Sequence, residues 1–229
     1  SNMANLRTNN LSGEQGQNAY RGSVFFNGGS DSLVIPASSD FAYGTGDFTI
    51  EAWIWKDARP ATGETRGIFT QTQSGNDYIV FKIGSTNNIQ ATFGSTTIST
   101  TGTLAVDSWN HVAVSRSSNT IKVFLNGIAS SGSTVSTDFS DTTRDPTIGN
   151  YTHSYGSLPY YGYISNLRVT KGEALYTADF TPPTTELTAD ANTVLLCCQD
   201  SDDPLQEATG KTITGKGRYE YLNDEEVVL

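Results

Sequence analysis

Apolar and polar residues alternate along most of this chain with the two-residue period of β-strands. The clearest case is residues 47–55, which read DFTIEAWIW. Alternation places two sets of side chains on opposite faces of this predicted strand: Phe48, Ile50, Ala52 and Ile54 on one, and Thr49, Glu51, Trp53 and Trp55 on the other. No stretch shows the spacing of an amphipathic helix, so the pattern predicts an all-β protein.

Further strands follow at short, regular intervals. They are predicted at residues 23–27, 32–36, 67–72, 78–83, 89–93, 96–100, 109–116, 120–125, 128–135, 147–149, 160–170 and 193–199. Asn126-Gly127 is the strongest hairpin signal, because both residues tolerate positive φ. Short strands separated by turn residues about every 8–12 positions indicate a two-sheet antiparallel sandwich.

Residues 160–183 contain the longest predicted strand and its exit. Tyr160 to Thr170 is rich in aromatic and β-branched residues. Lys171 to Phe180 is a connection that allows one helical turn around Leu175. Pro182 and Pro183 then end regular structure, because proline cannot donate to a ladder.

The two ends differ from the centre in composition. We expect residues 1–20 to be an N-terminal arm that includes an expression scar, Ser1-Asn2, and residues 21–199 to be the folded domain. Residues 200–229 are predicted to be an acidic C-terminal tail or an extra strand at residues 217–222.

Charge narrows the expected partners. A net charge of −10 and a pI near 4.5 argue against nucleic acid and anionic membranes, whose phosphates would be repelled. No apolar run is long enough to span a bilayer, and residues 1–20 show no signal peptide. Cys197 and Cys198 are adjacent, so we expect free thiols and assembly in a reducing compartment.

Five stretches occur in an order that resembles a known family. They are FFNGGSDSLVIP, DFTIEAWIW, SWNHVAVSR, IKVFLNG and GYISNLRVTKGEALYTADFTPP. As a set they resemble the laminin-G-like branch of the concanavalin A-like lectin/glucanase superfamily, over about residues 21–199. The resemblance implies a jelly-roll sandwich of two antiparallel sheets, one of them concave. From the residues themselves, we expect Trp53 and Trp109 to fill the core and Trp55 and Tyr78 to reach a sheet face. Within the last stretch, residues 168–183, RVTKGEALYTADFTPP, are similar to domains of phage and viral structural proteins and of bacterial surface proteins.

A tyrosine-rich loop is the candidate ligand site. Its aromatic side chains are Tyr151, His153, Tyr155, Tyr160 and Tyr161. Tyrosine offers a flat amphipathic surface at low entropic cost, which suits glycan recognition. The same side chains also suit packing of the loop on the core or a protein interface, and the sequence does not separate these alternatives.

A structural calcium ion is the cofactor that the resemblance implies. In the family, aspartates stand before the arginine of the long strand and after the phenylalanine of the first strand. This chain has Asn166 and Asn27 at those positions, and Asp31 lies nearby. Amide and carboxylate oxygens are ligands that Ca²⁺ accepts, so these three residues are the predicted metal site.

Catalysis is not expected. A glycosidase needs two facing carboxylates, about 5 to 9.5 Å apart. The neighbours of Glu51 on its face are Thr49 and Trp53, and no other strand supplies a carboxylate pair. His111 and His153 are the only histidines, and no serine or cysteine stands in a nucleophile-elbow pattern.

Three functions remain in competition. The preferred one is a non-enzymatic structural or adhesion module on a virion surface, assembled in the host cytoplasm, either decorating a capsid or forming part of a tail fibre. Its partners would be capsid or tail proteins, host glycans and further copies of the chain in a homo-oligomer. The alternatives are a free-standing lectin for host surface glycans and a polysaccharide hydrolase.

Overall fold

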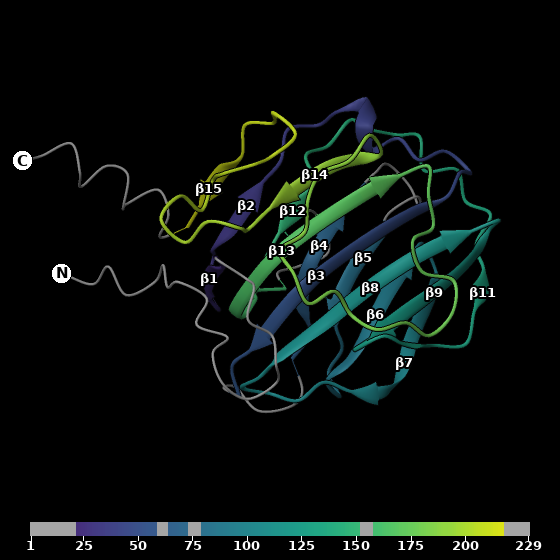
Figure 1. Ribbon diagram of the computed structural model, residues 1–229, viewed down its shortest axis with the longest axis horizontal. Coiled ribbons are helices and arrows are strands. Elements are labelled where there is room, and N and C mark those ends of the chain that lie inside the picture. The colour runs from purple at the N-terminus through teal and green to yellow at the C-terminus, as the bar shows by residue number, and fades with distance from the viewer. Residues whose placement is uncertain (1–21, 59–63, 73–78, 152–157, 218–229) are drawn as a thin grey trace, which may run out of the picture.

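The computed structural model describes residues 22–58, 64–72, 79–151 and 158–217, and they form two antiparallel β-sheets packed face to face (Figure 1). This confirms the predicted all-β sandwich. The expected arm at residues 1–20 lies outside the described residues. None of the described helices is long and apolar enough to cross a membrane.

Sheet A has eight strands, with a six-strand path β1-β13-β3-β8-β9-β10; β14 also pairs with β13, and β11 with β9. The bounds are β1 Val24–Asn27, β3 Phe48–Lys56, β8 Trp109–Ser117, β9 Thr120–Leu125, β10 Ile128–Ala129, β11 Ser133–Thr134, β13 Tyr161–Lys171 and β14 Thr193–Cys197. The long predicted strand is therefore β13, at the centre of this sheet.

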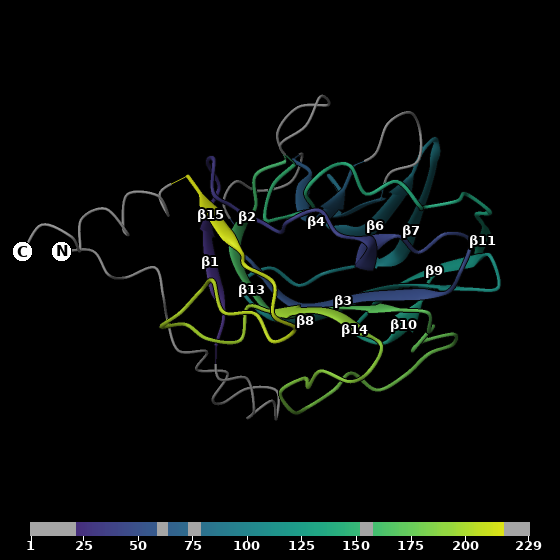
Figure 2. The ribbon, with the colours of Figure 1, turned by 90° about the horizontal axis from the view of Figure 1, so that it is seen from above.

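Sheet B has seven strands in the order β15-β2-β12-β4-β5-β6-β7. The bounds are β2 Ser32–Val34, β4 Arg66–Gln71, β5 Ile79–Ile83, β6 Asn88–Phe93, β7 Thr96–Thr103, β12 Thr147–Ile148 and β15 Thr214–Lys216. Figure 2 shows the two sheets as separate layers, with β3, β8 and β13 in one and β4, β6 and β7 in the other.

The core lies between the two sheets. The face of β3 predicted to be apolar, with Phe48, Ile50, Ala52 and Ile54, is fully buried in it. Sheet B contributes Phe69, Phe81 and Phe93 among others. Each such side chain stabilises the fold by about 1.5–3 kcal/mol relative to exposure, so burying the two apolar faces against each other favours the sandwich.

Several local predictions need correction. Asn126 and Gly127 form the expected hairpin, with φ of 50° and 81°, but the strand predicted at residues 128–135 is split into β10 and β11. The helical turn near Leu175 is absent, because backbone groups there bond to sheet A instead. A short 3-10 helix, η1, occupies Ser39–Phe41.

The C-terminal boundary predicted at residue 199 was too early. Residues 200–217 continue the fold, because Ile213 is buried in the core and β15 pairs with β2 at the edge of sheet B. Strand β15, Thr214–Lys216, was not predicted from the sequence, and residues 218–222 of the strand predicted at 217–222 lie outside the described residues. Cys197 and Cys198 are buried free thiols, as predicted.

A segment that we call the strap, residues 172–188, crosses the outer face of sheet A (Figures 1 and 2). Several hydrogen bonds attach its backbone to the sheet. Among them, Leu175 N–H donates to Thr49 Oγ1 at 2.9 Å, Phe180 N–H to the Gly127 carbonyl at 2.9 Å, and Lys122 Nζ to the Thr177 carbonyl at 2.8 Å. The strap therefore decides which part of that face meets solvent.

Candidate functional site

The tyrosine loop is only partly at the surface. Tyr160 is 1 % exposed, its ring packs edge-on against Phe26 in the core, and its hydroxyl donates to the Trp55 carbonyl at 3.1 Å. Tyr151 is also buried. Neither ring offers a surface to a ligand, because both fill space inside the sandwich. His153 and Tyr155 lie outside the described residues.

Tyr161 has a different position, on the outer face of sheet A. It lies beside four aromatic side chains that stand directly opposite one another on neighbouring strands: Phe25 on β1, Tyr163 on β13, Trp55 on β3 and Trp109 on β8. We call these four residues the aromatic row. Each of them, and Tyr161, is half-buried.

The rings of the row contact one another at an angle. Phe25 and Tyr163 have centroids 5.0 Å apart and tilted by 49°, and Trp109 lies 6.4 Å from Tyr163 and 6.0 Å from Trp55. Tyr161 meets Phe25 edge-on at 5.9 Å. Across three strand spacings the row extends about 14 Å, so it forms a ridged platform of ring faces and edges.

The local sequence explains why the row is continuous. Alternation puts Tyr161 and Tyr163 on one face of β13, and Gly162 between them has a φ of 140°. A Cβ at this glycine would collide with the Trp55 carbonyl, so only glycine lets β13 approach β3 this closely at the row.

The rings of the row are half-buried, whereas the neighbouring outward-pointing residues of β3 and β8, Trp53 and His111, are fully buried beneath the strap. Trp53, two residues before Trp55, is 1 % exposed and contacts His111 edge-on at 5.4 Å. The expectation that Trp53 and Trp109 fill the core between the sheets was wrong, because both alternate with the core residues of their strands and point outward. The expectation that Trp55 reaches a sheet face is confirmed, whereas Tyr78, for which the same was expected, lies outside the described residues.

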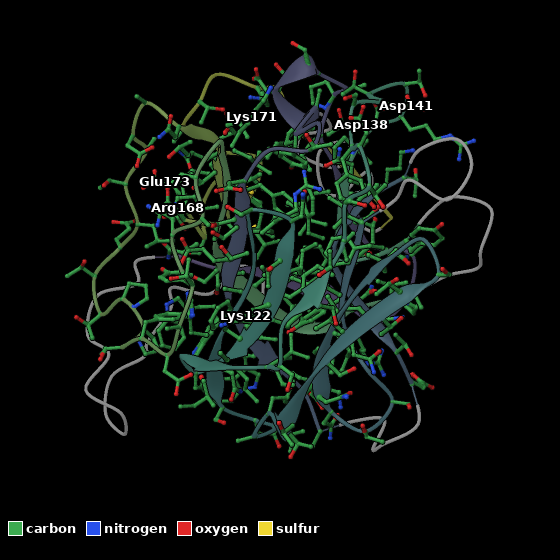
Figure 3. The ribbon with its side chains drawn as sticks, turned by 90° about the vertical axis from the view of Figure 1, so that its right-hand side faces the viewer. Lys122, Asp138, Asp141, Arg168, Lys171 and Glu173 are labelled. Carbon is green, nitrogen blue, oxygen red and sulfur yellow. The ribbon has the colours of Figure 1, made fainter. Side chains whose placement is uncertain are left out.

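Beneath the strap lies a buried polar network centred on Glu51. Its Oε1 accepts hydrogen bonds from Arg168 Nε at 2.9 Å and Nη2 at 2.6 Å. Its Oε2 accepts one from the Tyr176 hydroxyl at 2.7 Å and lies 3.0 Å from His111 Nε2. Figure 3 shows Arg168 on the side of the molecule that carries the strap, away from Asp138 and Asp141.

Electrostatics within this network favours the ionised carboxylate. Burial would raise the pKa of Glu51, but the hydrogen bond and charge of His111, followed by the charge of Arg168, lower it overall. Burial and the neighbouring Glu51 carboxylate raise the pKa of Tyr176, which therefore stays a hydrogen-bond donor. The network joins the strap to β3 and β13.

Aromatic packing reinforces this attachment. Tyr176 and Phe180 of the strap stack with centroids 3.7 Å apart and an interplanar angle of 6°. Both rings meet Phe124 and His111 edge-on. His111 is thus held between strap and sheet, which gives it a structural role.

Glu51 is also the one carboxylate on the described strands, and it is 0 % exposed with both oxygens engaged. It cannot approach a substrate without the strap leaving. The described part of sheet A therefore offers no position for the two-carboxylate chemistry of a glycosidase.

The residues proposed for calcium do not meet at one point. Asn27 pairs with Tyr161 on β13, and Asn166 lies five residues further along that strand, roughly 16 Å away. Asn166 Oδ1 accepts hydrogen bonds from Leu187 N and Gln199 Nε2, both at 2.9 Å, and so joins β13 to the strap.

Asn27 and Asp31 do remain neighbours. The Asn27 N–H donates to Asp31 Oδ2 at 3.2 Å, and Asn27 Oδ1 accepts from the Gly29 N–H. Within the described ranges, no group of three or more His, Cys, Asp or Glu side chains is placed to hold a metal ion. Calcium binding stays a prediction, and its three-residue site is not assembled.

Sequence reasoning missed three members of the aromatic row: Phe25, Tyr163 and Trp109. The available signal was the alternation of aromatics in Trp53–Trp55 and Tyr161–Tyr163, which assigns each pair to one face. It did not reveal that residues 25, 55, 109 and 163 share a register, because each pairing joins positions distant in sequence.

The family model described as the concanavalin A-like lectin/glucanases superfamily matches residues 27–177. The chain therefore belongs to this family, and within it to the laminin G group that the sequence resembles. No match is found among curated proteins.

Solved structures show the same fold at low sequence identity. A Bacteroides ovatus protein whose name proposes carbohydrate binding is 20% identical, with a TM-score of 0.64 over 85% of this chain and 59% of that one. A Ruminococcus gnavus sialidase module, CBM40, bound to α2,3-sialyllactose, is 13% identical, with a TM-score of 0.53 over 68% and 92%. Domains LG4-5 of the mouse laminin α1 chain are 15% identical, with a TM-score of 0.50 over 72% and 48%.

Proposed function

We propose that this chain is a non-enzymatic carbohydrate-binding module that holds a glycan on the aromatic row. The observation that carries the proposal is the alignment of four half-exposed rings across neighbouring strands, beyond the cover of the strap. Monomeric proteins seldom leave such apolar surface open unless it binds something. The names of the Bacteroides ovatus protein and of CBM40 support a carbohydrate as the ligand.

The chemistry of the row suits a sugar. Sugar rings present C–H groups on their faces, and these pack against the electron-rich face of an aromatic ring. The tyrosine hydroxyls and indole N–H groups at the edges of such rings can bond to sugar hydroxyls. Because the rings are tilted by 46° to 73°, one glycan strand would meet faces and edges in turn.

A glycan array followed by isothermal titration calorimetry tests the proposal. We expect Trp109→Ala to weaken binding of the selected glycan about tenfold, because an aromatic contact contributes on the order of 1 kcal/mol and burial adds to it. Trp109→Phe should recover part of the affinity. Ile128→Ala is the matched control, since Ile128 is apolar, 62% exposed and outside the row.

Two results would contradict the proposal. One is the absence of any bound glycan on the array at high protein concentration. The other is unchanged affinity in Trp109→Ala and Tyr163→Ala. If these substitutions instead abolish self-association in analytical ultracentrifugation, the row is a protein interface.

We further propose a virion surface as the setting of this module, with capsid or tail proteins as partners and assembly in the host cytoplasm. The resemblance of residues 168–183 to phage structural domains supports this. The test is incorporation of the chain into particles after deletion of residues 3–20, and after deletion of residues 218–229. Incorporation that persists in both deletions would contradict docking by either end.

A further inference from the structure

Two aspartates flank the tryptophans of the aromatic row. Asp57 lies two residues after Trp55, and Asp107 lies two residues before Trp109. Because Trp55 and Trp109 are paired across β3 and β8, both aspartates lie at the same end of these strands. At about 3.4 Å per residue, each is roughly 7 Å along the chain from its tryptophan. Asp57 is half-buried and Asp107 is exposed, so negative charge borders this end of the row.

Hydrogen bonds hold both aspartates at this edge of sheet A. The Asp57 N–H donates to the Tyr161 carbonyl at 3.1 Å, which extends the pairing of β3 with β13 by one residue. The Asp107 N–H donates to the Lys56 carbonyl at 2.9 Å. The Asp107 Oδ1 accepts from the Ala58 N–H at 3.0 Å, so this carboxylate is fixed beside the end of β3.

The cations on the described strands of sheet A are buried or engaged elsewhere. Lys56 lies near both aspartates, but its side chain alternates with the core residues of β3 and is 2 % exposed. Arg168 bonds to Glu51 beneath the strap. Three others donate to backbone carbonyls: Arg116, Lys122 and Lys171. On these strands, therefore, no exposed and unengaged cation offsets the two aspartates beside the row.

We propose that the aromatic row is selective for a cationic carbohydrate, a chain of amino sugars whose protonated amines lie over the tryptophan rings and face Asp57 and Asp107. This inference rests on the function proposed above and names the charge class of its glycan. Tryptophan attracts a cation most strongly among the aromatic side chains when the cation lies within about 6 Å of the ring centroid. The net charge of −10 also draws a polycation toward the protein.

The proposed selectivity follows from charge complementarity. N-acetylation of an amino sugar removes its positive charge, so the sugar loses its attraction both to the ring faces and to the carboxylates. An anionic sugar keeps the stacking surface but meets repulsion from Asp57, Asp107 and the net negative charge of the chain. The row should therefore rank sugars with the same ring geometry as cationic, then neutral, then anionic.

Calorimetry with three oligosaccharides tests this ranking. The probes are a β1,4-linked glucosamine hexamer, its fully N-acetylated form and a galacturonate hexamer. At about pH 6 exposed aspartates are ionised. We expect the glucosamine hexamer to bind at least about tenfold more tightly than its N-acetylated form, and the galacturonate hexamer to bind most weakly. The tenfold advantage should shrink in about 1 M salt, where the Debye length falls to about 3 Å.

Asparagine variants separate the carboxylates from the rings. The double variant Asp57→Asn with Asp107→Asn should reduce the advantage of the glucosamine hexamer by about threefold or more and leave the affinity for the N-acetylated form unchanged. Trp109→Ala should weaken both forms. Asp145→Asn is the matched control, because Asp145 is also exposed and also accepts one backbone N–H, from Ala37 at 2.8 Å. It should alter none of these affinities.

Equal binding of the amine and N-acetylated forms would overturn this inference while the function proposed for the row stands. The same holds if the double variant keeps the full advantage, or if the array selects another glycan and the glucosamine hexamer does not bind. Absence of binding by every glycan would instead remove the proposed function itself. A lysine hexapeptide that binds as tightly as the glucosamine hexamer would assign the row to a cationic protein segment. Circular dichroism of each variant checks that the fold is intact.

Discussion

The two outer faces of the sandwich use charge in opposite ways. On sheet A, Glu51, Arg168 and His111 are buried beneath the strap and bonded to one another. On sheet B, Lys82 is half-buried and has no ion-pair partner among the described residues. Charge on sheet A therefore attaches a segment of the chain, whereas the charge of Lys82 on sheet B has no such role among the described residues.

This difference shows why the titratable residues of a lectin-like fold need not form its site. Glu51 and His111 would attract attention in any search for catalytic groups, yet their contacts are internal. The aromatic row shares strand β3 with Glu51, but its ring faces lie beyond the buried network, and none of the row's own side chains is titratable near neutral pH.

The largest effect should come from removing the centre of the buried network. Glu51→Ala leaves Arg168 without its counter-charge and the Tyr176 hydroxyl without its acceptor. We expect a loss of about 3–5 kcal/mol in the free energy of unfolding, measured by urea denaturation. Glu173→Ala, on the exposed side of the strap, should change stability by less than about 0.5 kcal/mol.

If Glu51→Ala does not fold, Glu51→Gln keeps the shape of the side chain and tests the charge alone. If Glu51→Ala lowers the free energy of unfolding by less than about 1 kcal/mol, the network does not hold the strap on sheet A. Buried charge would then not distinguish the outer face of sheet A from that of sheet B.

The pH dependence of stability should show the same network at a smaller scale. Because the pKa of Glu51 is lower in the folded state than the ordinary value of 4.5, its ionised form stabilises the fold above that pH. This contribution should be lost as pH falls below about 4.5 toward the folded pKa. Urea denaturation at pH 6 and at lower pH would measure it.

Asp40 and Asp190 also have lowered pKa values, so the wild-type protein will lose stability in acid from several groups. The informative quantity is the difference from Glu51→Gln, which lacks the titrating carboxyl. Identical acid profiles for the two proteins would contradict the prediction.

The smallest effect is expected on the accessible side of sheet B. Thr92→Val removes an exposed hydroxyl pair with Thr97 and should cost less than about 0.5 kcal/mol. Thr70→Val makes the same chemical change on the covered side, where the hydroxyl donates to Asn150 and pairs with Thr147, and should cost about 1–3 kcal/mol. Equal costs by urea denaturation would mean that both sides of this face are equally covered.

Much of the fold could be predicted from the chain alone. Period-two alternation identified β3, β8, β9 and β13, and it assigned the inner face of β3 correctly. Less of the candidate site could be predicted. Trp55 was expected at a sheet face, whereas the sequence left open whether Tyr160 and Tyr161 bind a ligand or pack on the core. Tyr160, which directly precedes β13, is buried, and Tyr161 is half-buried.

The sequence by itself determined which side chains share a face of each strand, because alternation is a local property of the extended backbone. It also determined the family, through the order of five stretches. Only the tertiary structure decided which outer positions the strap covers and which rings align. Those outcomes depend on pairings between residues more than 100 positions apart, such as Phe25 with Tyr163 and Glu51 with Arg168. They also depend on packing between distant segments, which the local pattern of either segment does not predict.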